Sequence, residues 1–329
     1  MSYDGRIMRR AQQRFEEDRK AREESFRRKE EAIWTKEPRL REIDRELRST
    51  MSRIIASALH RGTDPRPAVA VLRDQNLNLQ QEKKELLRGL GLSEDYLDEK
   101  PNCPLCGDTG FRGAAVCRCL REYYAREQKK ELSALLNLGV QSFDTFSLDW
   151  YSSRTSPEMG MSPRENMEII YEVCANYAHT FFLKSGNLLL YGAPGLGKTF
   201  LSACIAREVS DGGFSVVYDT AGHIFSRLEA KKFGREDDAA ETNRIFESDL
   251  LILDDLGTEM TTTFIVSALY EVVNTRLLTG KATILNTNLT PPEIPTRYSP
   301  QIASRIEGEY RILPFFGDDI RRLKKEREQ

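Results

Sequence analysis

One glycine-rich segment of the chain has residue types and spacing that suit phosphate binding. Residues 192–199 read Gly-Ala-Pro-Gly-Leu-Gly-Lys-Thr and match the pattern G-x-x-x-x-G-K-[ST] in full. Glycines let the backbone curl so that its N–H groups converge on an anion, and a following helix adds its positive end. We expect Lys198 to reach the β- and γ-phosphates of a nucleotide and the Thr199 hydroxyl to ligate Mg²⁺. The expected nucleotide-binding residues here are Gly192, Ala193, Pro194, Gly195, Leu196, Gly197, Lys198, Thr199 and Phe200.

A second motif supplies carboxylates. Residues 250–255 read Leu-Leu-Ile-Leu-Asp-Asp, which is a buried strand followed by two acids. In an open parallel sheet, ligands bind at the carboxyl ends of the strands. We therefore expect Asp254 to bind Mg²⁺ through water and Asp255 to polarise the attacking water. The two motifs together predict binding of a nucleoside triphosphate with Mg²⁺.

Four of the six cysteines form a compact module. Cys103 and Cys106 make a C-x₂-C pair, and Cys117 and Cys119 make a C-x-C pair after ten intervening residues. This spacing is typical of a structural Zn²⁺ site with four thiolates, although free thiols and an iron–sulfur cluster are alternatives. The other two, Cys174 and Cys204, are expected to be buried packing residues.

Alternating strands and helices must position the glycine-rich segment and the two acids. From residue 166 onward, short apolar stretches alternate with helical patterns, which predicts an α/β fold with a parallel sheet covered by helices on both faces. The expected strands are 187–191, 214–218, 249–254, 282–287 and 311–315, and the expected helices are 166–183, 198–210, 221–234 and 262–279. This order places the glycine-rich segment between a strand and a helix, and the two acids at a strand end.

Composition excludes several classes of protein. The 329 residues contain 49 Lys and Arg against 51 Asp and Glu, so any contact with nucleic acid must come from local basic patches. No apolar run approaches the roughly 20 residues of a membrane helix, and the N-terminus is too charged for a signal peptide. We expect a cytoplasmic protein without a membrane partner.

The N-terminal part is highly charged. Residues 1–50 contain 15 basic and 12 acidic side chains, so we expect the first 30 or so to form a frayed or solvent-exposed helix at best. Apolar residues at three- and four-residue steps then predict one helix between Leu40 and Leu59 and a second at about 68–90. A short turn containing proline predicts an antiparallel hairpin, which either packs only on itself or serves as a docking arm.

Several further segments resemble one family. ATILNTNL (282–289), TRYSPQIASRI (296–306) and FFGDDIRRLK (315–324) resemble the AAA+ ATPases of the bacterial helicase-loader group, the DnaC/DnaI type. That group also includes the IstB-like transposition helpers. DDLGTE (254–259) and YEVVNTRL (270–277) are further hallmarks, and the resemblance runs from about residue 143 to 323.

The resemblance implies roles for individual residues. Asn288 resembles sensor 1, with Asn286 as the alternative one pleat away. Arg305 resembles the arginine finger, which acts on ATP held by a neighbouring subunit, and Arg321 resembles sensor 2; a surface ion pair is the alternative for either. Because such a finger is worth roughly 10³–10⁵ in rate, hydrolysis should require self-association into an ATP-dependent ring or spiral.

Two features depart from the usual pattern. Asp255 stands where most AAA+ proteins carry Glu, so its shorter side chain could slow hydrolysis, and whether Glu259 assists is left open. Only 14 residues follow the last expected strand, so we expect no full C-terminal helical lid, and Arg321 on a short terminal helix instead.

A basic segment is a candidate DNA contact. Residues 223–236 carry four cations interleaved with two rings, a combination that suits phosphates and bases of single-stranded DNA. An ordinary amphipathic helix is an equally good interpretation, and the acidic run 236–238 weakens the patch. The residues concerned are Arg227, Lys231, Lys232, Arg235, Phe225 and Phe233.

We expect three domains: a helical arm for partner docking (1–100), a zinc module with a helical connector (101–136) and an AAA+ ATPase domain (137–329). The resemblance implies a slow ATPase, stimulated by assembly or DNA, that loads the replicative DNA helicase onto single-stranded DNA during replication initiation or restart. The alternatives are an IstB-like helper of a DNA transposase and a nucleotide-locked adaptor with vestigial hydrolysis. The expected cofactors are ATP, Mg²⁺ and Zn²⁺.

Overall fold

The computed structural model describes residues 3–59, 66–136, 141–182, 185–232, 234 and 239–328. Its residues form two compact units, Met1–Gln13 with Arg118–Gln329, and Arg14–Cys117. These units are defined by packing. The three expected domains, which meet at residues 100 and 136, are instead defined by composition, motifs and expected roles. That functional division stays a prediction.

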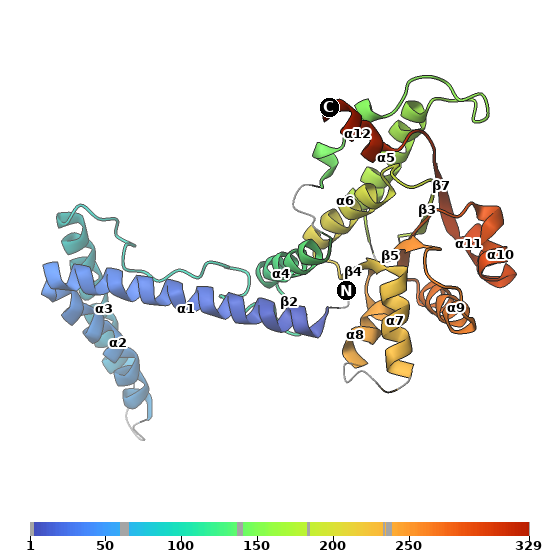
Figure 1. Cartoon of the computed structure of the whole chain (residues 1–329). Helices are drawn as coiled ribbons and strands as arrows, with labels where there is room; N and C mark the ends of the chain where they lie inside the picture. The colour runs from blue at the N-terminus through green and yellow to red at the C-terminus, as the bar shows by residue number, and fades with distance from the viewer. Residues whose placement is uncertain are drawn as a thin grey trace. The chain divides into compact units, whose positions relative to one another are not determined.

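The first unit is built on a five-stranded sheet (Figure 1). The strands are β3 (Asn187–Gly192), β4 (Val216–Thr220), β5 (Leu250–Leu256), β6 (Ala282–Thr287) and β7 (Tyr310–Phe315). Their order is β4-β5-β6-β3-β7, and every neighbouring pair is parallel. Each strand lies within two residues of its expected place, so the predicted parallel α/β sheet is confirmed. Because β6 lies between β3 and β5, it separates the glycine-rich segment from the two acids.

The helices of this unit are α4 (Arg118–Leu136), α5 (Pro163–His179), α6 (Lys198–Asp211), α7 (Ala221–Lys232), α8 (Ala239–Glu247), α9 (Thr263–Leu278), α10 (Ile294–Arg297), α11 (Pro300–Glu309) and α12 (Ile320–Glu328). Successive strand residues point to opposite faces of the sheet. Leu188 and Leu190 therefore enter a core with α5 and α6, while Leu189 enters a core with α7 to α11. Cys174 and Cys204 are fully buried in the first core, as expected, and burial raises the pKa of both thiols to about 12.

Several helices differ from the sequence expectation, and α10 and α11 were not among the expected elements. The helix expected at 166–183 begins at Pro163, because Ser162 and Glu165 form a capping box: the Ser162 N–H donates to Glu165 Oε2 at 2.8 Å, and the Glu165 N–H donates to Ser162 Oγ at 3.2 Å. Helix α8 was not expected; it contributes Ile245 to the second core.

The first residues of the chain pack on the first unit. Asp4 precedes α1 (Gly5–Lys36), and its N–H donates to the Tyr124 hydroxyl at 3.0 Å while its carboxylate pairs with Arg244 of α8. Ile7 and Ala11 are fully buried. The expectation of a frayed or solvent-exposed helix is wrong here, because an ion pair and a short apolar stripe fix the start of α1.

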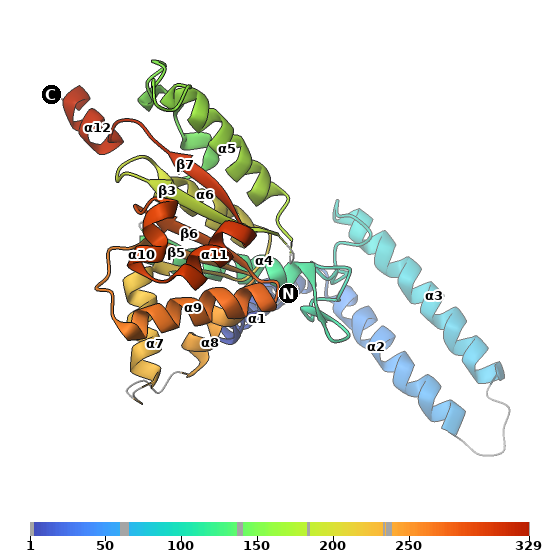
Figure 2. The same ribbon diagram turned by 90° about the vertical axis from the view of Figure 1, so that its right-hand side faces the viewer.

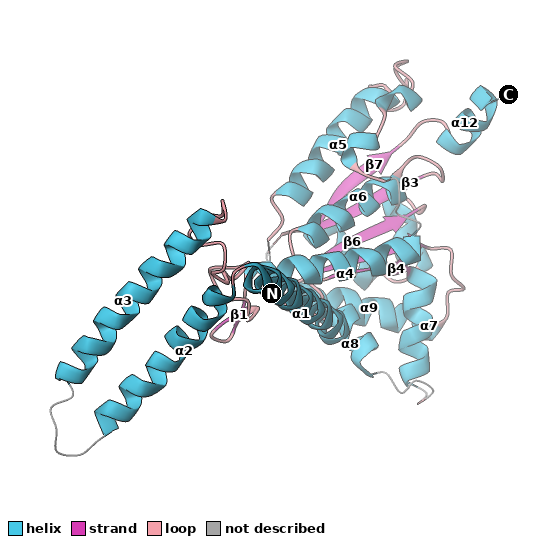
Figure 3. Ribbon diagram, turned by 90° about the vertical axis from the view of Figure 1, so that its left-hand side faces the viewer, coloured by secondary structure: helices cyan, strands magenta, loops and turns pink. Residues whose placement is uncertain are grey.

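The second unit contains a helical hairpin. Helices α2 (Pro38–Leu59) and α3 (Arg66–Gly89) run side by side and antiparallel, as expected (Figures 2 and 3). Arg39 donates to both carboxylate oxygens of Glu82, at 2.7 and 3.0 Å. A small core of Ile33, Leu40, Leu87 and Leu97 joins the two helices to the end of α1. The turn at residues 60–65 lies outside the described residues. Across the described chain, no helix has the length and apolar character to cross a membrane.

The second unit also contains most of the cysteine module. Its strands β1 (Phe111–Arg112) and β2 (Ala115–Val116) form a two-stranded antiparallel hairpin. This hairpin reverses the chain between the two cysteine pairs.

Candidate active site

The glycine-rich segment connects the end of β3 to the start of α6, as the sequence predicts. Gly192 and Gly197 have φ values of +140° and +98°, which a residue with a Cβ rarely adopts. A Cβ on Gly192 would lie 2.1 Å from the Phe315 carbonyl oxygen, and one on Gly197 would lie 2.7 Å from the Tyr151 hydroxyl. The spacing of glycines is therefore required by both the backbone turn and the close approach of neighbouring elements.

Lys198 is folded back over this loop. Its Nζ donates to the carbonyl oxygens of Gly192 and Ala193 at 2.6 and 2.8 Å, and to Asn288 Oδ1 at 2.8 Å. The residue is 7% exposed. Burial lowers the pKa of the ammonium to about 8, although Asp255 and Asp254 oppose this effect. A bound anion would favour the charged form and raise this pKa.

The two acids at the end of β5 have different surroundings. Asp254 is buried: its Oδ1 accepts from Asn286 Nδ2 at 2.9 Å and from Thr199 Oγ1 at 3.3 Å, and its Oδ2 accepts from the Tyr218 hydroxyl at 2.7 Å. Asp255 is exposed at the cavity. Partial burial and the neighbouring Asp254 charge raise the pKa of Asp255 above its ordinary value. Asp254 is thus fixed by three side-chain donors and by the Asp255 N–H, whereas the Asp255 side chain is exposed.

Asn286 lies within β6, whereas Asn288 lies just after its end. Asn286 is fully buried, and its amide joins Asp254 to the Ser202 hydroxyl, which donates to Asn286 Oδ1 at 2.9 Å. Asn288 follows the end of the strand, lines the cavity and accepts from Lys198. The geometry favours Asn288 for contact with a ligand and gives Asn286 a supporting role. The sensor assignment itself stays a prediction.

A cavity of about 310 Å³ opens beside the loop. This volume lies at the lower end of the range for small-molecule sites. Its lining combines rings, the glycine-rich loop, acidic and amide side chains and two cations of α12: Gln141, Thr145, Phe146, Ser147, Trp150, Tyr151, Pro194, Gly195, Leu196, Gly197, Lys198, Thr199, Phe200, Asp255, Asn288, Ile320, Arg321 and Lys324. Apart from Gly192, Ala193 and Asp254, all the residues expected in the loop and at the strand end line it.

One wall of the cavity was not predicted as part of the site. Phe146 stacks on Tyr151 and Tyr171, with centroid distances of 5.9 and 5.3 Å, and lies 5.6 Å from the Phe200 ring. The Tyr151 hydroxyl donates to the Leu196 carbonyl oxygen at 3.0 Å and so joins this wall to the loop. The density of rings in residues 143–151 was the available sequence signal.

The two expected arginines occupy different places. Arg321 of α12 lines the cavity, and its charge helps to lower the pKa of Lys198. Arg305 of α11 lies outside the lining in the described part of the chain. Its Nη2 donates to the Tyr270 hydroxyl at 3.2 Å, and its guanidinium lies 5.3 Å from the centre of that ring. Arg305 therefore does not serve the cavity of its own chain in this structure.

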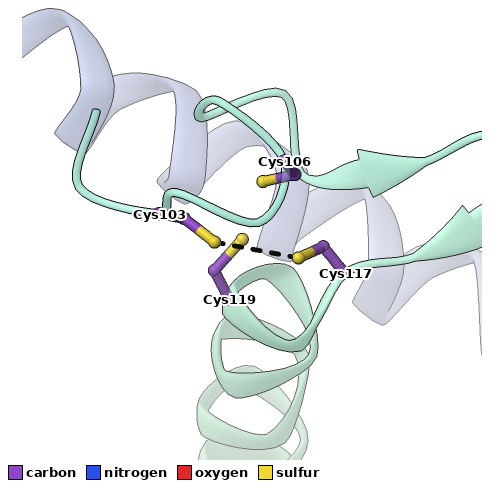
Figure 4. Close-up of side chains that lie close together, drawn as sticks. All are labelled: Cys103, Cys106, Cys117 and Cys119. Carbon is purple, nitrogen blue, oxygen red and sulfur yellow. Dashed lines mark hydrogen bonds between the residues drawn. The ribbon is translucent and has the colours of Figure 1, made fainter. Parts of the chain in front are cut away.

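The donor sets suit the expected metals. The Thr199 hydroxyl and the Asp254 carboxylate are hard oxygen ligands of the kind that Mg²⁺ takes, and their nearest oxygens lie 3.3 Å apart. The Sγ atoms of the four cysteines of residues 103–119 all lie within 4.8 Å of one another (Figure 4). In a tetrahedral thiolate site with Zn–S bonds of about 2.3 Å, sulfurs lie about 3.8 Å apart, which matches the 3.8 Å between Cys103 and Cys117.

Backbone hydrogen bonds shape the cysteine module. The Gly107 N–H donates to the Cys103 carbonyl oxygen at 2.9 Å, and the Cys117 N–H donates to that of Gly110 at 2.9 Å. Asp108 accepts from the Cys103 N–H at 2.7 Å. These bonds fix the first turn and the return of the second pair independently of a metal.

Several side chains of the candidate DNA-contact segment already have partners within the protein. Phe225 is 2% exposed in the second core, so the expectation that its ring stacks on a base is wrong. Arg227 pairs with Asp219 at 3.1 Å, and Lys232 lies 5.2 Å from the centre of the Phe264 ring. Lys231 donates to Asn243 at 3.1 Å. Phe233, Arg235 and the acidic run 236–238 lie outside the described residues.

Comparisons with known proteins indicate an ATP-binding domain. Residues 172–296 match the family described as IstB-like ATP binding protein. The chain is 25% identical over 244 residues to the replicative helicase loader DnaI of Bacillus subtilis, covering 65% of this chain and 72% of that protein. It is 31% identical over 142 residues to an insertion sequence IS21-like putative ATP-binding protein of Bacteroides fragilis, covering 43% of this chain and 49% of the relative. The resemblance stated from the sequence is confirmed.

Among solved structures, the crystal structure of the DnaC helicase loader aligns with a TM-score of 0.46 at 18% identity, covering 55% of this chain and 99% of that chain. The crystal structure of DnaI aligns with a TM-score of 0.45 at 17% identity, covering 58% and 99%.

Proposed function

From the match of residues 172–296 to the IstB-like ATP binding protein family, we propose that the chain is a cytoplasmic ATPase whose activity depends on assembly. Its proposed role is to load a replicative DNA helicase onto single-stranded DNA. The observation that carries the ATPase part is the convergence of three strand ends at one cavity. The glycine-rich loop lies after β3, Asp254 and Asp255 lie near the end of β5, and Asn288 follows β6.

The residues divide the work of hydrolysis between them. Lys198 neutralises the phosphates, while Tyr218, Thr199 and Asn286 orient the Asp254 carboxylate. Mg²⁺ at Thr199 and Asp254 would neutralise charge on the phosphate oxygens. Asp255 lines the cavity, so its carboxylate can accept a proton from a water bound there.

Assembly is part of the proposal because of Arg305. Its guanidinium is held against Tyr270 and away from the cavity of its own chain. An arginine that completes the site of a neighbouring subunit would make hydrolysis depend on self-association in a ring or spiral.

The helicase-loader role is favoured by the extent of the match. The DnaI relative aligns over 244 residues, or 72% of its length, whereas the IS21-like relative aligns over about half. The four-cysteine module, proposed to hold Zn²⁺, and the α2–α3 hairpin, proposed to dock the helicase, lie outside the matched family domain. Lys231 and Lys232 at the end of α7 are the described cations proposed to contact single-stranded DNA.

The test combines hydrolysis with helicase binding. Phosphate release by the parent should exceed that of Lys198→Ala, should rise with protein concentration and should rise further with single-stranded DNA. Pull-down with a replicative helicase should require ATP. Equal release by the parent and Lys198→Ala would leave only a nucleotide-locked adaptor, the reading that the short Asp255 side chain favours.

An IS21-like transposition helper is the second candidate, because the relative with 31% identity is described as such an ATP-binding protein. It predicts assembly that depends on the length of duplex DNA rather than on single strands. Filaments that grow with duplex length, together with failure to bind any replicative helicase, would select this function.

A further inference from the structure

The segment that follows Asp255 holds a conformation that its own sequence does not favour. Asp255 has φ of +53°, in the left-handed region that residues with a Cβ avoid, and the β5–β6 pairing is irregular between Leu253 and Leu256. Non-glycine residues in this region persist only where surrounding contacts determine the backbone. The backbone at Asp255 is held by its own N–H, which donates to Asp254 Oδ1 at 3.0 Å, and by contacts of residues 256–259.

Some of those contacts come from β6 and from the loop itself. The Thr287 hydroxyl donates to the Leu256 carbonyl oxygen at 2.6 Å, and the Thr258 hydroxyl donates to that of Asp255 at 2.8 Å. The Gly257 N–H donates to Glu259 Oε2 at 3.0 Å. Glu259 thus closes the loop on one side with one carboxylate oxygen.

The other side of Glu259 faces α10 and the residue after it. The Tyr298 hydroxyl donates to Glu259 Oε1, and Arg297 Nη2 donates to the carbonyl oxygens of Gly257, at 3.1 Å, and Glu259. Tyr298 is 7% exposed. Burial first, and then the Glu259 carboxylate, raise the pKa of this phenol, so it remains a donor. Both oxygens of Glu259 are engaged, and Glu259 lies outside the cavity lining in the described chain.

The same contacts lead directly to the helix that bears Arg305. Tyr298 directly follows α10, and Ser299 caps α11 by accepting from the Ile302 N–H at 3.3 Å. Arg305 lies within α11, which packs on α9 in the second core (Figure 2). Tyr298 therefore connects the start of α11 to Glu259, two residues from Gly257 and four from Asp255.

We propose that Glu259, Tyr298 and Arg297 form a clasp that positions Asp255 and couples its orientation to the helix bearing Arg305. Glu259 is a positioning residue and does not assist the attacking water directly. Contact of Arg305 with nucleotide on a neighbouring subunit would shift α11 and, through this clasp, adjust Asp255 in the subunit's own cavity. Such coupling is reciprocal, so nucleotide binding in one subunit also biases the finger that it presents. The inference rests on the proposed ATPase function.

The test is a pair of matched hydroxyl deletions. Tyr298→Phe removes the donor to Glu259, whereas Tyr177→Phe removes a phenol bond to the Gly186 carbonyl oxygen far from the cavity. Tyr298→Phe should lower kcat of the assembled protein about tenfold or more while KM for ATP stays within about twofold, because the attacking water loses its alignment but the phosphate loop is intact. Tyr177→Phe should leave both values at the parent level.

Amide hydrogen exchange gives a readout that does not depend on turnover. Exchange at residues 255–259 should accelerate in Tyr298→Phe and not in Tyr177→Phe. If the two variants have the same exchange at 255–259, the clasp is refuted whatever the rate of the parent. If Tyr298→Phe exchanges faster but keeps the parent kcat in an active assembly, the coupling to Asp255 is refuted. Failure of the proposed function is separate: the parent would hydrolyse ATP no faster than Lys198→Ala.

Discussion

Nucleotide binding should weaken as pH rises above about 8, because of Lys198. The Lys198 ammonium is 7% exposed and donates to three oxygens, and burial lowers its pKa to about 8 in the nucleotide-free protein. A triphosphate placed beside the ammonium favours its charged form and raises this pKa. Binding above pH 8 must therefore take up a proton.

The size of the effect follows from the pKa. With a pKa of about 8, Lys198 is about nine-tenths protonated at pH 7 and about one-tenth protonated at pH 9. The bound form keeps its proton throughout this range. The affinity is therefore fully present below pH 8, falls as pH rises through it, and is about tenfold lower at pH 9 than at pH 7.

The assay is equilibrium titration with a fluorescent ATP analogue and Mg²⁺ between about pH 6.5 and 9.5, with calorimetry in buffers of different ionisation heat to count protons. Lys198→Met is the control, because it removes the titrating group: its binding should be weak at every pH and show no such fall. The reasoning is refuted if the parent binds equally at pH 7 and 9, takes up no proton at pH 9, or falls in parallel with Lys198→Met.

Further predictions concern β6 and the cysteines. Asn286→Leu should lower the free energy of unfolding by about 2 kcal/mol in denaturant titration, because it removes a donor to the buried Asp254 carboxylate and leaves the buried Ser202 hydroxyl without its acceptor; no loss would contradict this. Asn288→Ala should leave that free energy within about 0.5 kcal/mol of the parent yet slow hydrolysis about a hundredfold; an unchanged rate would remove its sensor role. Metal analysis should find one zinc per chain, lost in Cys117→Ser but kept in Cys174→Ser; zinc retained in both, or lost from both, would refute the site.

The parts of the fold that could be predicted have local signals. The strand before Asp254 is four consecutive apolar residues, and the loop before Lys198 is fixed by three glycines and its flanking strand and helix. Both depend on residues adjacent in sequence, so periodicity and residue type sufficed.

The parts that were missed depend on packing between distant segments. The hydroxyl of Tyr218 on β4 reaches Asp254 only because β4 and β5 are neighbours in register. The choice between Asn286 and Asn288 required knowing that β6 ends at Thr287. The sequence left two interpretations of the helix that bears Phe225 equally open, and only the packing of Phe225 with Ile224 in the second core excludes base stacking by this ring.

The account depends most on a nucleotide site shared between two subunits. Lys198→Ala and Arg305→Ala should each abolish assembly-stimulated hydrolysis, and an equal mixture of the two should recover about a quarter of the parent rate. That fraction of interfaces joins an intact phosphate loop to an intact finger if subunits mix at random around a head-to-tail ring or spiral. Phosphate release by the mixture is the decisive measurement. A mixture as inactive as its components, despite confirmed co-assembly, or an Arg305→Ala protein as active as the parent, would contradict the account.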